Sequence, residues 1–205
     1  MGLGQGLRKM LRKQLLHAWA LPGTIVVIAT AVLLFGDDAA TALRYDRAAI
    51  AASEFVRLVS GHAVHLSVAH YILNVAGLLV VWYLVGAAFS NRLWAVIIAT
   101  SIAAMDAGFW FLMPTLAWYV GLSGLLHGIL AAGITGIWRT RRTEALILAG
   151  LMLGKLIHEA LIGPLPGSEG TAGGDVVTEA HLLGAIGGFA AGLLFSIRVR
   201  PDVPI

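Results

Sequence analysis

The sequence predicts an all-α membrane protein built as a bundle of six membrane-spanning helices. Of the 205 residues, 59% are hydrophobic and only 12% are charged, and the mean hydropathy is +0.86. Soluble domains carry about a quarter charged residues, so this composition indicates a multi-pass membrane protein. The apolar residues fall into six runs, each near the length of about 20 helical residues that crosses a bilayer. Because no shift in composition divides the chain, we expect one domain over residues 1–205, with a six-helix core at 19–197.

The first predicted span covers residues 19–35, between a basic stretch at residues 1–18 and an acidic pair at 37–38. A basic stretch before an apolar run is also typical of a secretory signal peptide, and residues 40–42 (Ala-Thr-Ala) resemble a cleavage site. Pro22 within the run and the acidic pair before the possible cut favour a helix that is retained.

The other five spans are predicted over residues 65–89, 93–112, 123–138, 144–162 and 177–197. A loop at residues 37–61 is long enough to hold a short amphipathic or re-entrant helix near residues 50–59. A second long loop begins at residue 163 and is rich in Gly and Pro, which indicates a flexible connection. Both loops are expected on the same side of the membrane, where they would serve as lids.

The basic residues predict the orientation of the bundle. With a cytoplasmic N-terminus, ten of them fall on the cytoplasmic side: Arg8, Lys9, Arg12, Lys13, Arg92, Arg139, Arg141, Arg142, Arg198 and Arg200. Only Arg44, Arg47 and Arg57 fall outside, as the positive-inside rule requires. Both termini, including the tail at 198–205, are therefore expected in the cytoplasm. The net charge of +3 then reflects orientation in the membrane, and no nucleic-acid partner is expected.

Four polar residues lie near the starts of the second, fourth and sixth spans, which run in the same direction in this topology. They are His70, Asn74, Ser123 and His181, and they share a depth towards the outer leaflet. Serine becomes a nucleophile when a base such as His takes its proton. His70 and Asn74 share a helix face, and the first turn of a helix has free N–H groups, so donors for an oxyanion are also present. The sequence shows no obvious acidic third member, because Glu179, which is near His181, points away from it on the same helix.

Small residues at helical spacing predict that the fourth and sixth spans approach closely. They are Gly124, Gly128, Ala132 and Gly136 on one span, and Gly184, Gly188 and Gly192 on the other. Such stripes allow helix backbones to pack closely in lipid, which a hydrogen bond between Ser123 and His181 requires.

Taken together, these motifs resemble those of the rhomboid intramembrane serine proteases. Residues 121–124 (Gly-Leu-Ser-Gly) are similar to the family's Gly-x-Ser-Gly motif, and residues 180–188 to its histidine motif. Residues 65–74 resemble the second-helix pattern of His, four residues, His, three residues, Asn. The motifs occur in the correct order, so the resemblance implies a rhomboid-like bundle. One departure is Val56, which replaces the Trp of the family's first-loop Trp-Arg pair.

The resemblance also implies roles for individual residues. Ser123 is expected to be the nucleophile and His181 the general base, with His70 and Asn74 in the oxyanion hole. His65 is expected to be a structural histidine beneath the first loop. Supporting positions are also expected at Gly121, His127 and Glu159.

Residues 121–128 (Gly-Leu-Ser-Gly-Leu-Leu-His-Gly) and the pair Lys155 and Glu159 resemble the rhombosortase branch of the family. That branch is associated with bacterial secreted proteins that end in a GlyGly-CTERM signal, which is a Gly-Gly stretch, a hydrophobic helix and a basic tail. The resemblance implies a protease of the bacterial inner membrane with its active site towards the periplasm, its partners being such transmembrane substrates and the lipid bilayer. Transfer of the acyl group to water or to an amine acceptor is left open.

Several alternatives stand beside this interpretation. His127, four residues after Ser123, is expected to pack in the site, although it is also placed to act as a rival base. Lys155 and Glu159 form either a mutually neutralised ion pair or a surface that faces the substrate. The sequence has no Cys and no His-Glu-x-x-His motif, so neither a metal nor another cofactor is expected.

Two other functions would also suit a small membrane protein with polar residues in its helices. A catalytically inactive rhomboid-like protein would bind membrane segments without cleaving them, but it would have no need of the complete set of polar residues. A small transporter would show internal repeats and helices broken near the midplane, and the sequence has neither.

Overall fold

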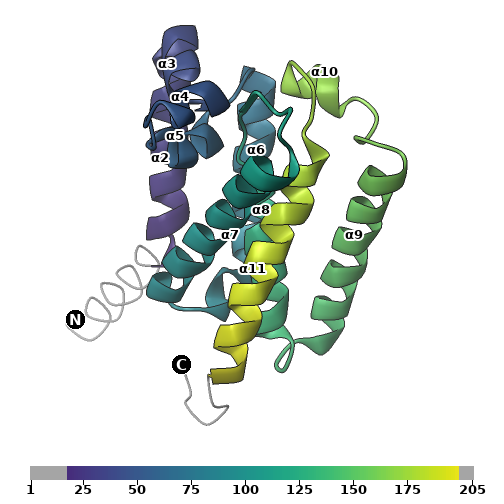
Figure 1. The fold of residues 1–205 in the computed structure, drawn as a ribbon. Helices are drawn as coiled ribbons and strands as arrows, with labels where there is room; N and C mark the ends of the chain where they lie inside the picture. The colour runs from purple at the N-terminus through teal and green to yellow at the C-terminus, as the bar shows by residue number, and fades with distance from the viewer. Residues whose placement is uncertain (1–17, 199–205) are drawn as a thin grey trace, which may run out of the picture.

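The computed structural model describes residues 18–198, which are mostly helical (Figure 1). The longer helices are α2 (Ala20–Leu34), α6 (Val68–Val85), α7 (Asn91–Leu112), α8 (Ser123–Ile137), α9 (Arg142–Leu161) and α11 (Thr178–Arg198). Their bounds lie within a few residues of the six predicted apolar runs. The basic N-terminal stretch before residue 18 and the tail after residue 198 lie outside the described residues, and so do the termini whose side was predicted.

Three helices within the described part of the chain are long and apolar enough to cross a membrane by themselves: α6, α7 and α11. A fourth span results if α2 is counted with α3 (Gly36–Leu43), to which it is joined at a bend of 120°. Helix α8 has 15 residues, or about 22 Å of helix, and α9 carries four charged residues in its 20. The fold is that of an apolar helical bundle, whereas the crossing of the bilayer by all six helices stays a prediction.

Helix α8 lies at the centre of the bundle, and ten of its 15 residues are buried. It packs most extensively against α11, where glycines let the two backbones touch. A side chain at Gly184 would overlap the carbonyl oxygen of Gly124, and one at Gly188 would overlap that of Gly128. The predicted close approach is therefore present, except that Gly136 faces Ala88 and Phe89 instead of α11.

The loop that follows α2 contains more structure than the single short helix predicted near residues 50–59. It forms α3, α4 (Arg47–Ala51), α5 (Arg57–Ser60) and the 3-10 turn η1 (Gly61–Ala63). Ser53 breaks the predicted helix, because its positive φ of 77° does not continue a right-handed helix.

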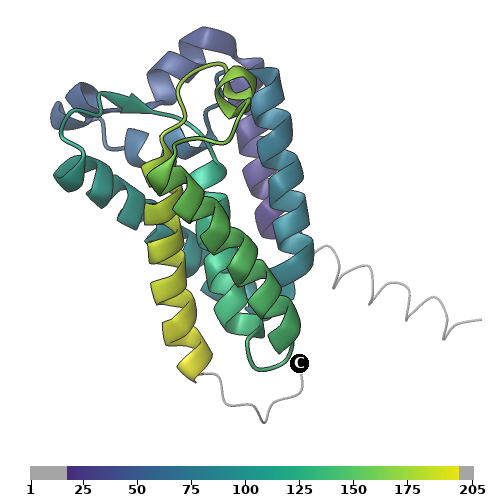
Figure 2. The same cartoon turned by 90° about the vertical axis from the view of Figure 1, so that its right-hand side faces the viewer.

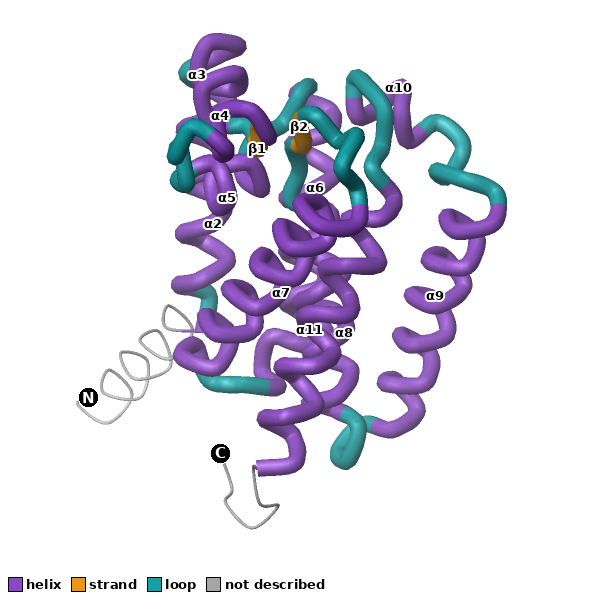
Figure 3. The backbone as a smooth tube through the Cα atoms, viewed as in Figure 1, coloured by secondary structure: helices purple, strands orange, loops and turns teal. Residues whose placement is uncertain are grey.

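Two contacts fasten this loop to the bundle. Strands β1 (Tyr45–Asp46) and β2 (Trp118–Tyr119) pair antiparallel, with Tyr45 opposite Tyr119 (Figure 3). The Arg47 guanidinium donates hydrogen bonds to the carbonyls of Met113 and Leu116, at 2.9 and 3.1 Å, and to that of Phe109. It thereby caps the end of α7, where carbonyls have no partner within the helix.

Helix α9 lies at the right-hand side of the bundle in Figure 1 and in front of the other helices in Figure 2, where that side faces the viewer. Only Ala145 and Glu159 of its 20 residues are buried. A loop then leads to α10 (Ser168–Ala172), a short helix within the segment that was predicted to be flexible. Ser67 holds α10 in place by donating a 2.8 Å hydrogen bond from its hydroxyl to the carbonyl of Thr171.

Candidate active site

Ser123 is the first residue of α8, directly after a tight turn. Gly121 forms this turn with a φ of 126°, which side-chain-bearing residues rarely adopt. Its N–H donates to the carbonyl of Gly61 at 3.2 Å, and its carbonyl accepts a 2.9 Å hydrogen bond from the hydroxyl of Tyr119. The turn is thus held from both sides, which fixes the position of Ser123 at the head of the helix.

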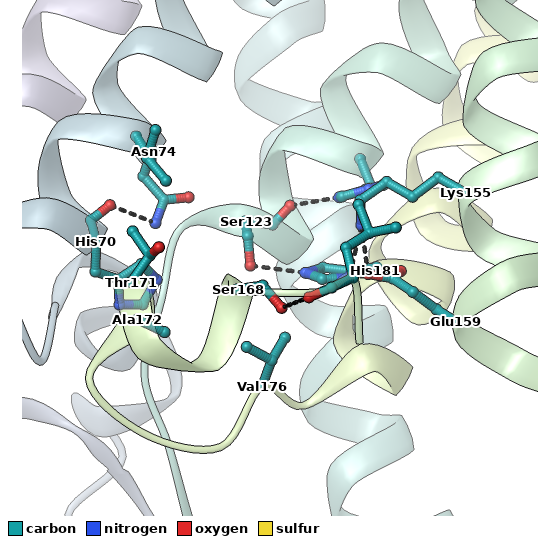
Figure 4. Close-up of a pocket in the computed structure, with 13 residues that line it drawn as sticks. His70, Asn74, Ser123, Lys155, Glu159, Ser168, Thr171, Ala172, Val176 and His181 are labelled. Atoms are coloured by element: carbon teal, nitrogen blue, oxygen red, sulfur yellow. Dashed lines mark hydrogen bonds and ion pairs between the residues drawn. The ribbon is translucent and has the colours of Figure 1, made fainter. Parts of the chain in front are cut away.

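His181 lies in the first turn of α11 and is buried. Its Nε2 is 2.9 Å from the Ser123 hydroxyl oxygen, a hydrogen-bond distance (Figure 4). Gly124 directly follows Ser123, and Gly184 lies one turn after His181. The contact between these two glycines allows α8 and α11 to bring Ser123 and His181 this close. The structure therefore joins the two residues that sequence analysis paired.

Glu159 of α9 is the partner of His181 on the side away from Ser123. Its Oε2 is 2.8 Å from His181 Nδ1, and its Oε1 is 2.6 Å from the ammonium of Lys155. Sequence analysis identified no acidic partner for His181, because it considered only neighbours on the same helix. Glu159 comes instead from a different helix, which passes beside α11. The ion pair between Lys155 and Glu159, one of the two alternatives for these residues, is present, but the same carboxylate also binds the imidazole.

His127 stacks on His181, with ring centroids 4.4 Å apart and an angle of 23° between the ring planes. Its Nδ1 donates a 2.7 Å hydrogen bond to the backbone carbonyl of Ser123. The ring thus packs against the imidazole and binds the backbone of Ser123. This geometry matches the packing role, whereas a rival base would be bound to the Ser123 hydroxyl.

His70 and Asn74 face Ser123 from α6, across the cavity from His181 (Figure 4). The Ser67 hydroxyl caps α6 by accepting a 3.0 Å hydrogen bond from the His70 N–H. Asn74 Nδ2 donates to the His70 carbonyl at 3.1 Å, which leaves its second N–H available. His70 Nδ1 is buried without a partner among the described residues.

His65 lies in the loop before α6 and supports His70. The two rings meet edge to face, with centroids 5.0 Å apart, and His65 Nδ1 donates to the Ala63 carbonyl at 3.1 Å. Burial, together with the neighbouring His70, lowers the pKa of His65 to about 4. The ring is therefore neutral near pH 7, consistent with a structural rather than a proton-transferring residue.

A cavity of about 230 Å³ joins these groups. Ser123, His181, His70 and Asn74 line it, and residues of the α10 segment line its other side. The second predicted lid thus covers the site, although whether it opens stays a prediction. The loop at 37–61 contributes no residue to this cavity and packs elsewhere, against α2 and α7.

One group of described residues has the composition of a metal site. His127, Glu159 and His181 offer ligand atoms within 4.8 Å of one another. The Lys155 ammonium already binds the carboxylate and lies 3.2 Å from His181 Nδ1. A cation there would meet this positive charge at close range, so we assign no metal to the group.

Comparison with protein families matches residues 52–198 to the Rhomboid domain. No curated protein matches the sequence at a significant level. The family match covers more than two thirds of the chain and contains the residues of the site described above. Rhomboid proteins are typically intramembrane serine proteases that act on transmembrane substrates within the bilayer. The chain therefore belongs to the rhomboid family.

Proposed function

We propose that this protein is an active intramembrane serine endopeptidase, with Ser123 as nucleophile and His181 as general base. The observation that carries the proposal is the 2.9 Å contact between His181 Nε2 and the Ser123 hydroxyl. A histidine at this distance can take the proton of the serine hydroxyl and make the serine a nucleophile. Burying ionisable groups in a largely apolar interior is energetically costly, so such groups are usually functional.

The reaction begins when His181 Nε2 takes the hydroxyl proton of Ser123 and the oxygen attacks the carbonyl carbon of the substrate peptide. The tetrahedral intermediate places a negative charge on the former carbonyl oxygen. We assign its stabilisation to the backbone N–H of Ser123, which is free at the start of α8, and to His70 and Asn74. Protonated His181 then donates to the leaving amine, and a second nucleophile releases the acyl group.

We further propose that the protein belongs to the rhombosortase branch and cleaves GlyGly-CTERM signals. A substrate helix followed by a basic tail places that tail in the cytoplasm and its Gly-Gly segment at the opposite membrane border. The candidate site also lies at one end of the bundle, where α6, α8 and α11 begin. A Gly-Gly segment has low helix propensity, so its backbone readily enters a site in extended form.

This proposal includes the topology given by the positive-inside rule. It has one domain over residues 1–205, six spans, both termini in the cytoplasm and the site towards the periplasm of a bacterial inner membrane. Fusion of a reporter to either end of the chain tests the side of the membrane on which each terminus lies.

The test of function is cleavage of a model substrate in cells. A secreted domain is fused to a Gly-Gly segment, an apolar helix and a basic tail, and is produced with the wild type or with Ser123→Ala. We expect cleavage at the Gly-rich segment with the wild type alone, and mass spectrometry of the new C-terminus distinguishes hydrolysis from transfer. Cleavage only of transmembrane substrates without Gly-Gly would keep the protease and reject the branch. If the folded wild type cleaves no substrate, an inactive membrane-segment-binding protein is the better description.

A further inference from the structure

We propose that Glu159 is a positioning residue that converts the Ser123–His181 pair into a triad assembled from α8, α11 and α9. The inference rests on the proposed serine-protease function and extends it by a third residue and by a role for Lys155. Its starting point is the 2.8 Å contact between Glu159 Oε2 and His181 Nδ1, in which both side chains are about 95% buried.

The direction of the hydrogen bonds follows from the chemistry of the partners. An ionised carboxylate only accepts, so His181 Nδ1 must carry the hydrogen of the bond to Glu159. The neutral imidazole then has its lone pair on Nε2, which faces the Ser123 hydroxyl at 2.9 Å. Glu159 therefore selects the tautomer in which His181 can accept the serine proton. It also stabilises the imidazolium that forms when the proton arrives.

Lys155 makes this role of Glu159 necessary. Its ammonium lies 2.6 Å from Glu159 Oε1 and 3.2 Å from His181 Nδ1. An ammonium only donates, so in the absence of Glu159 it would donate to Nδ1 and leave the hydrogen on Nε2. That tautomer cannot take a proton from Ser123. With Glu159 present, Lys155 instead binds the second carboxylate oxygen and balances its charge at a buried position.

The experiment compares seven proteins by the rate at which a fluorophosphonate labels Ser123, measured across a range of pH. They are the wild type, Glu159→Ala, Glu159→Asp, Glu159→Gln, Lys155→Met, the double variant Glu159→Ala with Lys155→Met, and the control Glu144→Gln. Glu144 lies on the same helix and pairs with Arg141 in an exposed position, far from the site in sequence. Thermal unfolding of each protein verifies that it is folded.

We expect Glu159→Ala to lower the labelling rate by about 10²- to 10⁴-fold, the upper value being the loss seen when a triad histidine has the wrong tautomer. Removing Lys155 as well should restore at least ten-fold, because the competing donor to Nδ1 is then gone. Glu159→Asp, which keeps the carboxylate, should retain more activity than Glu159→Ala. In Glu159→Gln the acid limb of the pH–rate profile should move to lower pH, because the imidazolium has lost the adjacent negative charge. Glu144→Gln should match the wild type.

Two results would overturn this inference while leaving the proposed function intact. One is a folded Glu159→Ala protein with the wild-type labelling rate and pH profile. The other is a double variant whose labelling rate is lower than that of Glu159→Ala by the same factor that Lys155→Met costs in the wild type. Such independent, additive losses are what a purely structural role for each residue predicts. If the folded wild type itself is never labelled, that result rejects the proposed serine-protease function and not only the role of Glu159.

Discussion

The substitution Gly184→Ala tests whether the contact between α8 and α11 sets the catalytic distance. A methyl group at Gly184 would lie 2.7 Å from the carbonyl carbon of Gly124 and would overlap its oxygen, whereas ordinary contacts begin at 3.4 Å. Backbone atoms cannot rotate away as a side chain can. The two helices must therefore separate by roughly 1 Å to restore an ordinary contact.

This displacement acts directly on the catalytic pair, because Gly124 follows Ser123 and Gly184 lies one turn after His181. The 2.9 Å contact between Ser123 and His181 would lengthen to about 4 Å, beyond hydrogen-bond range. A misplacement of about 1 Å typically costs on the order of 10²-fold in rate. The strain itself should reduce the free energy of unfolding by about 1–3 kcal/mol, as in other overpacked cores.

The assay measures fluorophosphonate labelling and thermal unfolding of Gly184→Ala beside Gly154→Ala. Gly154, on α9, has no neighbouring atom within 4 Å of an added methyl group, and alanine there should stabilise the helix by up to about 1 kcal/mol. Wild-type labelling and stability in Gly184→Ala would refute the argument that the glycine contact positions the pair.

Three further predictions concern residues around the site. His70→Ala and Asn74→Ala should each cost about 1–4 kcal/mol of transition-state stabilisation, measured as cleavage rate, with unfolding little changed; a wild-type rate in either would remove that residue from the oxyanion hole. Asp106→Asn should lower the free energy of unfolding by about 1–3 kcal/mol, because buried His62 Nε2 lies 3.4 Å from the Asp106 carboxylate and loses a charged partner; equal stability would show that this pair is not needed. His65 should make the protein less stable as the pH falls from 6.5 towards 4, because over that range the unfolded chain binds a proton that folded His65 excludes. The full loss in free energy of unfolding is roughly 3 kcal/mol, at about 1.4 kcal/mol per pH unit of pKa shift. Unfolding experiments at several pH values should show that His65→Gln removes this pH dependence. An unchanged pH dependence in His65→Gln would contradict the assignment to His65.

The sequence allowed the catalytic pair to be predicted because its evidence is local. Ser123 follows a glycine turn at the start of an apolar run, and His181 precedes regularly spaced glycines. Since both spans run in the same direction, their first turns had to meet at one end of the bundle. In the structure, His181 Nε2 lies 2.9 Å from the Ser123 hydroxyl oxygen, at the end where the two helices begin.

Glu159 could be named as a supporting residue but not as the partner of His181, for a physical reason. The two residues are 22 positions apart on different helices, and the rotation of α9 about its axis is not encoded in a short motif. Lys155, one turn earlier, also offered a complete local explanation for the carboxylate. Only the packing of α9 beside α11 shows that Glu159 binds both partners at once.

The loop after α2 was predicted less well than the helices. Its apolar residues suggested one helix near 50–59, but the positive φ of Ser53 divides that stretch between α4 and α5. The position of the loop depends on the pairing of Tyr45 with Tyr119 and on the bonds of Arg47 to the end of α7. These contacts join residues more than 60 positions apart, so no local sequence pattern predicts them.

The proposed mechanism requires that His181 activates Ser123 as a nucleophile, and mapping a covalent fluorophosphonate adduct by mass spectrometry tests this requirement directly. We expect a single phosphonylated residue, Ser123, in the wild-type protein in membranes. We expect no adduct in Ser123→Ala and a strongly reduced amount in His181→Ala. An adduct on another residue, or undiminished labelling of Ser123 without His181, would contradict this mechanism.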